Sequence, residues 1–452
     1  MIFEKRSNWR KASKMKTNNI EPIRQFREAV YQTIEPSRDA AFEVIDAIAA
    51  SREARSAVEV SLSPTMERTF SSVYGAVRRV RIETEELRKI LVKQAEASGT
   101  LDYDGWVLYA LDHTPYPRRA AKTVSDLGLV HGADGVEVGH QYSLLGRVMH
   151  AKGSWVGMVD VERIATYQTP TKVAAAQIDR LKLQAILKRI IAMDSEYVTG
   201  EILDTADEVT RLLIRFRGNR CLYDLPDLKP EGSPGAPPKH GDKMRLNQPD
   251  TLRPPNQHFR IAGDGGTWIV ISVWEQVHVT SRPNLPLCAI RVEVFTAAGT
   301  PRYSRPLWLA WTGPADLDWT SFWQVYLQRF CLECVHQFTK NSLAWTRARF
   351  ASTGREHRWT WLVMLAYWQL LLVAPLARDL LRPWEKPLPP DTLPSPGRVQ
   401  RDYPRLFLDL GTPARSPKPR GTPSGRPPGF HPAPRPRFRV LRKHQPALSA
   451  SP

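Results

Sequence analysis

Residues 106–112, WVLYALD, form a short apolar run that ends in Asp112. A continuous apolar run of this length is typical of a strand that is buried on both faces. Residues 190–194, IIAMD, repeat the pattern and end in Asp194. We therefore expect two buried strands, each with an acidic residue at its tip.

The segments around these two runs predict the rest of a mixed core. Strand-like runs follow the first at 136–150 and 154–164, and apolar residues at helical spacing occupy 171–190. After 190–194 come a short helical stretch and one further strand-like run at 211–223. The order strand, strand, strand, helix, strand, helix, strand predicts an α/β fold with a ribonuclease-H-like core.

Changes in composition predict the domain boundaries. Residues 22–94 show apolar residues at helical spacing, and Arg78, Arg79 and Arg81 give this bundle a basic edge, which suits either a reader of DNA ends or a docking bundle. Residues 266–313 alternate as antiparallel strands. The predicted division is a basic disordered segment 1–20, a helical domain 21–100, the first part of the core 101–223, a β-rich insertion 224–317, the last core helices 318–383 and a Pro/Arg-rich disordered tail 384–452.

Charge predicts a polyanionic partner. The 452 residues carry a formal net charge of +18, which favours nucleic acid or an acidic membrane surface. The tail from Pro383 holds 18 of the 38 prolines, so we expect it to be mobile and to form no core. The four cysteines are few and scattered, as in a reducing cytoplasm, and we interpret the CxxC of Cys331 and Cys334 as helix core rather than as a metal site.

One segment raises the question of a membrane. Residues 359–376, WTWLVMLAYWQLLLVAPL, are almost all apolar over the shortest length that can span a bilayer. Gln369 in the middle, Pro375 near the end and aromatic residues at mid-span favour a buried core helix. The N-terminus has no apolar run behind its basic start, so no secretion signal is predicted.

Residues 326–340, YLQRFCLECVHQFTK, place polar residues at intervals of three, four and seven. On one continuous helix, Tyr326, Arg329, Glu333 and Lys340 would form a single stripe, opposite a buried apolar face of Cys331, Leu332, Val335 and Phe338. The simpler alternative is a solvated face held by ion pairs, with Glu333 paired to Arg329 or Lys340.

Three carboxylates then stand out by position: Asp112, Asp194 and Glu333. Anions brought together raise one another's pKa, and a divalent cation relieves this cost. Oxygen ligands favour Mg²⁺ or Mn²⁺, and a pair of such ions suits phosphoryl transfer. Taken singly, each acid has a structural alternative: a turn residue for Asp112, a helix cap for Asp194 and an ion-pair partner for Glu333.

The spacing Tyr-x2-Arg-x3-Glu-x6-Lys resembles the YREK signature of bacterial insertion-sequence transposases of the DDE superfamily. Further blocks look like the same family, namely LDHTPYPR, HGADGVEVGHQYSLL, GSWVGMVDVERI, RLLIRFRGNRCLY, PLWLAWTG and GTPARSPKPRG. The resemblance implies that Asp112, Asp194 and Glu333 bind the metal ions. It also implies that Tyr326, Arg329 and Lys340 hold DNA phosphates.

One departure from that family concerns the second acid. The family's Asp-Gly-x-Tyr is here Asp194-Ser195-Glu196-Tyr197, so Glu196 and Asp204 are rivals of Asp194. His113 and His140 lie in resembling blocks, and buried structural roles are favoured for both over contact with DNA or water.

The sequence therefore predicts a magnesium-dependent (or manganese-dependent) transposase that cleaves the terminal inverted repeats of an element and joins them to target DNA. We expect two metal ions, a homo-oligomer on DNA, no membrane attachment and a cytoplasmic, nucleoid-associated location in a bacterium. A degenerate or domesticated relative that binds DNA without cutting it is the first alternative. A membrane-attached basic protein is the second.

Overall fold

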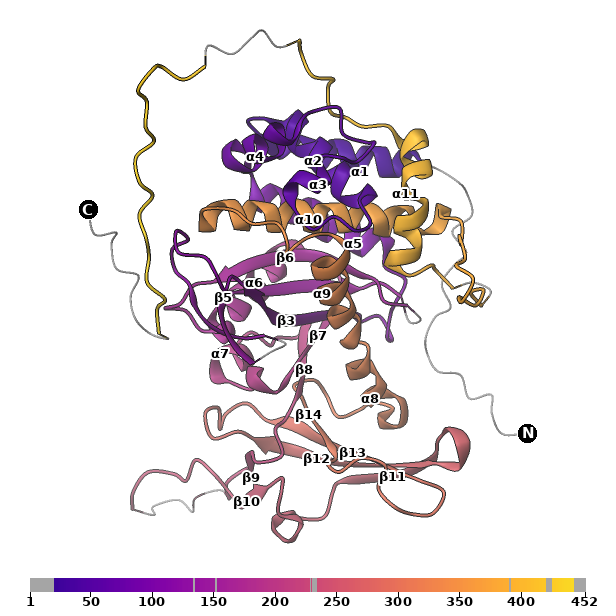
Figure 1. Ribbon diagram of the computed structural model, residues 1–452. Helices are drawn as coiled ribbons and strands as arrows, with labels where there is room; N and C mark the ends of the chain where they lie inside the picture. Colours follow the sequence, from indigo (N-terminus) through magenta and orange to yellow (C-terminus); the bar gives the residue numbers. More distant parts are fainter. Residues whose placement is uncertain are drawn as a thin grey trace. The chain divides into compact units, whose positions relative to one another are not determined.

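The chain has a mixed α/β architecture with a large mixed sheet in the computed structural model (Figure 1). Its described residues fall into two units, one formed by Leu101–Asp112 and Thr171–Phe330 and the other by the remaining segments. The predicted basic segment 1–20 lies outside the described residues except for Ile20. The structure describes residues 20–132, 135–150, 153–227, 229, 234–389, 392–419 and 425–442.

The first unit is built on three parallel strands, β3 (Val107–Pro117), β7 (Arg189–Met193) and β8 (Thr210–Arg215). Every residue of β7 is buried, and so are the first five of β3, because apolar side chains on both faces of a central strand must be covered. The two strands predicted from the sequence are confirmed, but only Asp194 follows the end of its strand, because β3 continues to Pro117 and Asp112 lies in its interior. Three helical segments of this unit follow the predicted order: α6 (Pro170–Gln184), η1 (Ser195–Tyr197) and α7 (Gly200–Leu203).

Antiparallel strands extend the sheet of the first unit beyond β8. The strand order from one edge is β10-β9-β12-β13-β14-β8-β7-β3, with β11 also paired to β12. The bounds are β9 (Cys221–Asp224), β10 (Lys243–Arg245), β11 (Gln257–Ala262), β12 (Trp268–His278), β13 (Leu287–Phe295) and β14 (Leu307–Trp311). Short 3-10 turns, η2 (Pro249–Thr251) and η3 (Asp264–Gly266), interrupt the connections.

Residues 211–223 were predicted as one strand, and this prediction is wrong. The segment forms most of β8 and then β9, separated by a turn in which the Arg220 N–H donates to the Arg217 carbonyl at 3.0 Å. The turn contains Gly218 and Asn219, two residue types that favour turns over strands.

The second unit combines antiparallel strands with most of the helices. β5 (Gly135–Val148) pairs with β4 (Gly128–Gly132) and β6 (Val156–Ile164), and it also neighbours the end of β3. The helices predicted in residues 22–94 are confirmed. The N-terminal elements are α1 (Glu21–Gln32), β1 (Ile34–Glu35), α2 (Arg38–Ala50), α3 (Ala57–Val60), α4 (Phe70–Arg79), β2 (Arg81–Ile82) and α5 (Thr84–Ser98).

Helix α10 (Thr353–Val373) is the core helix of the second unit, with η4 (Ala374–Leu376) at its end. It is the one helix among the described residues that is long and apolar enough to cross a membrane, but 83% of its most apolar window is buried inside the protein. Trp368, for example, donates from its indole to the Met158 carbonyl of β6 at 2.6 Å. Packing of this kind is what the interpretation as a buried core helix requires.

The prediction that residues 384–452 form no core is wrong for α11 (Pro396–Leu410). Val399, Tyr403, Leu406 and Leu410 are buried, and they recur at helical spacing despite the proline-rich context. The buried Arg27 guanidinium joins α11 to the core, because it donates to Asp46 at 2.9 Å and to the Gly411 carbonyl at 2.8 Å. The amphipathic pattern thus outweighs the composition in this stretch.

The prediction of a single helix over residues 326–340 is also wrong. The structure has α8 (Trp319–Leu327) and then α9 (Phe330–Ser342), with Gln328 and Arg329 in a turn between them. The N–H groups of these two residues donate to carbonyls three residues earlier, which tightens the turn and shifts the following residues out of helical phase. Tyr326 and Glu333 therefore belong to different helices.

Candidate active site

The pairing of β3 with β7 brings Asp112 and Asp194 together in the first unit. Leu111 pairs with Met193 in the parallel register, so the next residues on the two strands are neighbours. In-register residues of adjacent strands point to the same face of a sheet. The sequence predicted both acids at strand tips. Asp194 follows the end of β7, whereas Asp112 lies within β3, and the register makes the two positions adjacent.

The third parallel strand, β8, places a cationic side chain next to Asp194. Met193 pairs with Ile214, which places Arg215 of β8 beside Asp194. The Arg215 Nη1 lies 3.8 Å from Asp194 Oδ1, and both side chains are about half exposed. Sequence reasoning missed Arg215, although it follows the apolar run RLLI just as the acids follow theirs.

Asp194 is not acting as a helix cap. It is the residue before η1, but its side chain makes no capping hydrogen bond. Its Oδ1 is buried and has no hydrogen-bond partner among the described residues. A buried carboxylate oxygen without a hydrogen bond is costly, and a bound cation removes that cost.

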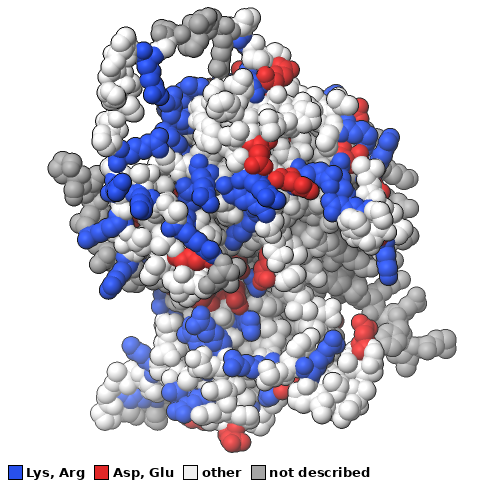
Figure 2. All heavy atoms as spheres, viewed as in Figure 1, with Lys and Arg blue, Asp and Glu red and all other residues white. Residues whose placement is uncertain are grey.

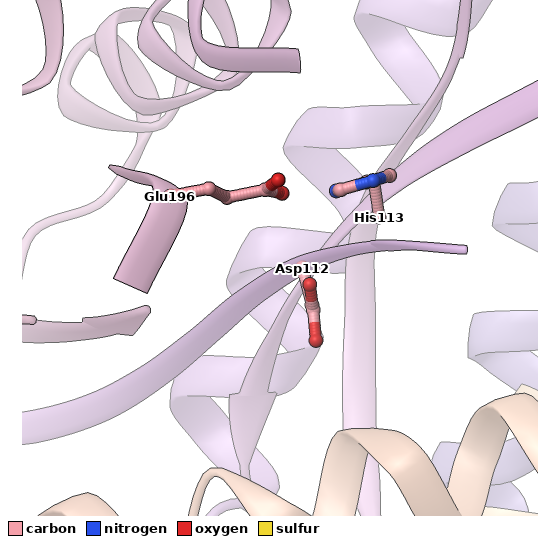
Figure 3. A group of neighbouring side chains, drawn as sticks. All are labelled: Asp112, His113 and Glu196. Carbon is pink, nitrogen blue, oxygen red and sulfur yellow. The ribbon is translucent and has the colours of Figure 1, made fainter. Parts of the chain in front are cut away.

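Glu196 lies close to Asp112 as well. One ligand atom each of Asp112, His113 and Glu196 lies within 4.8 Å of the others, and all three side chains are partly exposed. In Figure 3 the side chains of Asp112 and His113 leave β3 on opposite sides, as successive strand residues do, and the Glu196 carboxylate points toward His113. The residue two positions after Asp194 is thus a further oxygen donor at the strand tips.

Tyr197 anchors this acidic turn. Its ring is fully buried, and burial is the main reason that its pKa lies well above the usual value. The ionised groups close enough to act on it are Asp112, Glu196, Arg329 and Asp194. These charges therefore surround one buried side chain within the first unit.

Arg329 is the direct partner of Asp112. Its Nη1 donates to Asp112 Oδ2 at 2.8 Å across 217 positions of sequence, and the two side chains are only 11% and 18% exposed. Tyr326, on the preceding helix, is also buried, which raises its pKa to about 12. The alternative of a solvated helix face does not describe these two residues.

Glu333 and Lys340 lie on α9 in the second unit. The Lys340 ammonium donates to Thr114 Oγ1 at 2.6 Å, and burial lowers its pKa to about 8. The Cys331 thiol donates to the Gly153 carbonyl at 3.2 Å, and no cluster of metal ligands among the described residues includes either CxxC cysteine.

The remaining candidates have structural partners. Asp204 forms an exposed ion pair with Arg282. His140 is buried, with its Nε2 3.1 Å from Glu356 Oε2, as the favoured interpretation of this histidine expected. Of the two rivals for the second acid, Glu196 is therefore the one close to Asp112.

The donor set fits a hard divalent cation. Asp112 and Glu196 supply carboxylate oxygens and His113 supplies a ring nitrogen within one cluster. Asp194 is outside that cluster and adds a carboxylate on the strand next to Asp112. The guanidinium of Arg329 balances the charge of Asp112, which reduces the attraction of this carboxylate for a metal ion. Asp194 Oδ1 has no hydrogen bond among the described residues and only a 3.8 Å ion pair with Arg215, so this oxygen is available to a cation.

Residues 29–268 match the family model described as DDE superfamily endonuclease. The chain belongs to the DDE superfamily of endonucleases. A DDE endonuclease acts on DNA, and enzymes of this family typically use divalent metal ions. The matched residues include Asp112, Asp194 and Glu196 but end before α8 and α9. A search of curated proteins finds no match to this chain.

Proposed function

We propose that this DDE endonuclease is a transposase of a bacterial insertion sequence, which cleaves the ends of its element and joins them to target DNA. The observation that carries the proposal is the in-register pairing that sets Asp112 beside Asp194, with Asp194 Oδ1 buried and lacking a hydrogen bond among the described residues. The YREK spacing from Tyr326 to Lys340 supports the assignment to the insertion-sequence branch.

The fold proposed for the catalytic part is ribonuclease-H-like. The strand order β5-β3-β7-β8 supports it, because β3, β7 and β8 are parallel and β6 pairs antiparallel with β5. In such a fold, acids at the ends of adjacent central strands share one face. The strands after β8 are then an insertion between the second acid and Glu333.

Each residue of the proposed centre has a defined role. Asp112, Asp194 and Glu333 hold Mg²⁺ or Mn²⁺, and Glu196 and His113 are the neighbouring donors. When bound, two such ions supply Lewis acidity to the attacking and leaving oxygens of an in-line phosphoryl displacement. Water or a DNA 3′-hydroxyl attacks directly, so no protein side chain forms a covalent bond to DNA.

Tyr326, Arg329 and Lys340 are proposed to hold DNA phosphates beside the scissile bond. Arg329 suits this role because its planar guanidinium can contact a carboxylate and a phosphate in turn. Lys340 is half-buried next to Thr114, and an adjacent phosphate would favour its charged form. We further propose a homo-oligomer that holds two element ends and works in the bacterial cytoplasm.

A DNA-binding relative that has lost cleavage is the second candidate. Ser195 in place of the family's glycine and the ion pair between Arg329 and Asp112 are the observations that favour it. Incubating the purified chain and Mg²⁺ with the DNA that flanks its gene separates the two candidates. The transposase nicks or excises the terminal repeats, whereas the degenerate relative binds them and leaves both strands intact.

Substitutions then assign the residues. Asp112→Ala, Asp194→Ala and Glu333→Gln should each abolish cleavage and leave duplex binding intact. Full cleavage by the Asp194 variant would mean that another residue is the second acid, and Glu196 would be the first to test. Cleavage by the wild type in excess EDTA would refute the metal-dependent mechanism altogether.

A further inference from the structure

Helix α4 carries a stripe of exposed residues that the proposed active site does not use. Its Val73, Ala76 and Val77 are buried, whereas Phe70, Tyr74 and Arg78 are exposed at intervals of four residues. Residues four apart lie one above the other on a helix. The stripe therefore runs along one side of α4 and ends in a cation.

The connection between α9 and α10 lies beside the last turns of α4, within the same unit. The Tyr74 and Phe350 rings meet edge to face, with centroids 5.9 Å apart. The Arg358 guanidinium donates to the Val77 carbonyl at 3.1 Å. Arg349, next to Phe350, and Arg355, one turn before Arg358, are thus close to the end of α4.

Four arginines in this region form what we name the α4–α10 basic surface: Arg78, Arg347, Arg349 and Arg355. In the part of the chain that the structure describes, none of the four has an acidic partner within 4.0 Å. Arg78, Arg347 and Arg349 are exposed, and Arg355 is half-buried. In Figure 2 the blue spheres crowd the upper left, where Figure 1 shows α4 and the start of α10.

Like charges lie close together beside this surface, where Arg355 neighbours Arg358. The pKa of Arg358 is lowered, first by burial and then by the charge of Arg355. Repulsion of this kind destabilises the folded chain, and a polyanion bound across the surface would relieve it. Because the four cations come from three separate segments, they suit an extended anion better than a single phosphate.

We infer that the α4–α10 basic surface binds the phosphate backbone of duplex DNA outside the active site. The inference rests on the proposed function, since it supplies the DNA-cutting centre with a place to hold the duplex. Backbone contacts position a protein on DNA without reading its sequence. The surface therefore accepts element ends and target DNA through the same chemistry.

The test measures duplex binding by the full chain without metal, so cleavage does not contribute. The variant Arg78→Gln/Arg347→Gln/Arg349→Gln is compared with the control Arg52→Gln/Arg55→Gln/Arg302→Gln, which removes the same charge from exposed positions elsewhere. Fluorescence anisotropy with a labelled random-sequence duplex is recorded over a series of KCl concentrations. A second duplex carries the DNA that flanks the gene.

The surface variant should weaken binding to both duplexes and flatten the dependence of log K on log[salt] by about 0.9 for each phosphate that its arginines no longer neutralise. The control variant should keep the wild-type slope. An unchanged slope in the surface variant, with its thermal unfolding intact, refutes this inference and leaves the proposed cleavage function standing. Failure of the wild type to bind either duplex refutes both.

Discussion

Arg329→Gln tests the arrangement of the candidate active site most sharply. Removing one member of a buried ion pair costs about 3–5 kcal/mol, because the other charge stays buried without a partner. The side chains of Arg329 and Asp112 are 11% and 18% exposed, so water screens the remaining charge in part. We therefore expect a loss at the lower end of this range, about 3 kcal/mol in the free energy of unfolding. Urea denaturation followed by tryptophan fluorescence measures this loss.

Arg215→Gln is the matched control. Arg215 also pairs with an acid of the site, but at 3.8 Å and with 52% of its side chain exposed. Exposed pairs contribute about 0–1 kcal/mol, so this variant should unfold almost as the wild type does. A loss in Arg329→Gln no larger than that in Arg215→Gln would refute the assignment of Arg329 as the buried partner of Asp112.

A double-mutant cycle with Asp112→Asn completes the test. Replacing both members of a buried pair by neutral groups leaves no uncompensated charge. The double variant Asp112→Asn/Arg329→Gln should therefore be more stable than Arg329→Gln alone. Strictly additive losses would mean that the two side chains do not interact in solution.

Three further predictions concern other parts of the chain. The pKa of Lys340 is lowered to about 8 from 10.5, so the unfolded chain binds more protons than the folded chain between these pH values, and the stability of the wild type relative to Lys340→Met should rise from pH 8 to 10.5. Urea denaturation at pH 7, 9 and 10.5 measures this difference, and a difference that does not change with pH would contradict the lowered pKa of Lys340. Arg27→Met leaves Asp46 buried without its partner and should lower the free energy of unfolding by about 3–5 kcal/mol. Trypsin should also cleave faster at Arg401, because α11 loses the contact of Arg27 with Gly411. Equal cleavage rates in the variant and the wild type would count against the anchoring of α11. Asp204→Asn removes only an exposed ion pair and should leave Mn²⁺ affinity and DNA cleavage unchanged, so loss of either would make Asp204 the second acid after all.

The sequence predicts the central strands well because their side chains are buried on both sides. The runs that end in Asp112 and Asp194 contain hardly any polar residue, so their identity as strands and the positions of their acids follow from local pattern. Their adjacency depends on register, which only pairing across 82 positions of sequence defines. The pairing of β7 with β8 likewise shows that Arg215 lies beside Asp194, which the sequence pattern alone did not indicate.

Other features depend on long-range contacts or on competing local signals. No local pattern connects Arg329 to Asp112, and the turn at Gln328 and Arg329 interrupts a helical pattern that looks continuous in the sequence. In α11 the helical spacing of Val399, Tyr403 and Leu406 was visible, but the many prolines around it predicted the opposite. From the sequence, Glu196 was one of two alternatives to Asp194 as the second acid, and only the fold shows that it lies close to Asp112.

The measurement that bears most directly on the account is Mn²⁺ binding to the DNA-free protein, followed by electron paramagnetic resonance. Asp112 and Asp194 are proposed to share one ion-binding centre, so Asp112→Asn/Asp194→Asn should lose the bound Mn²⁺ signal that the wild type and Asp204→Asn retain. Equal Mn²⁺ binding by the double variant and the wild type would contradict the account.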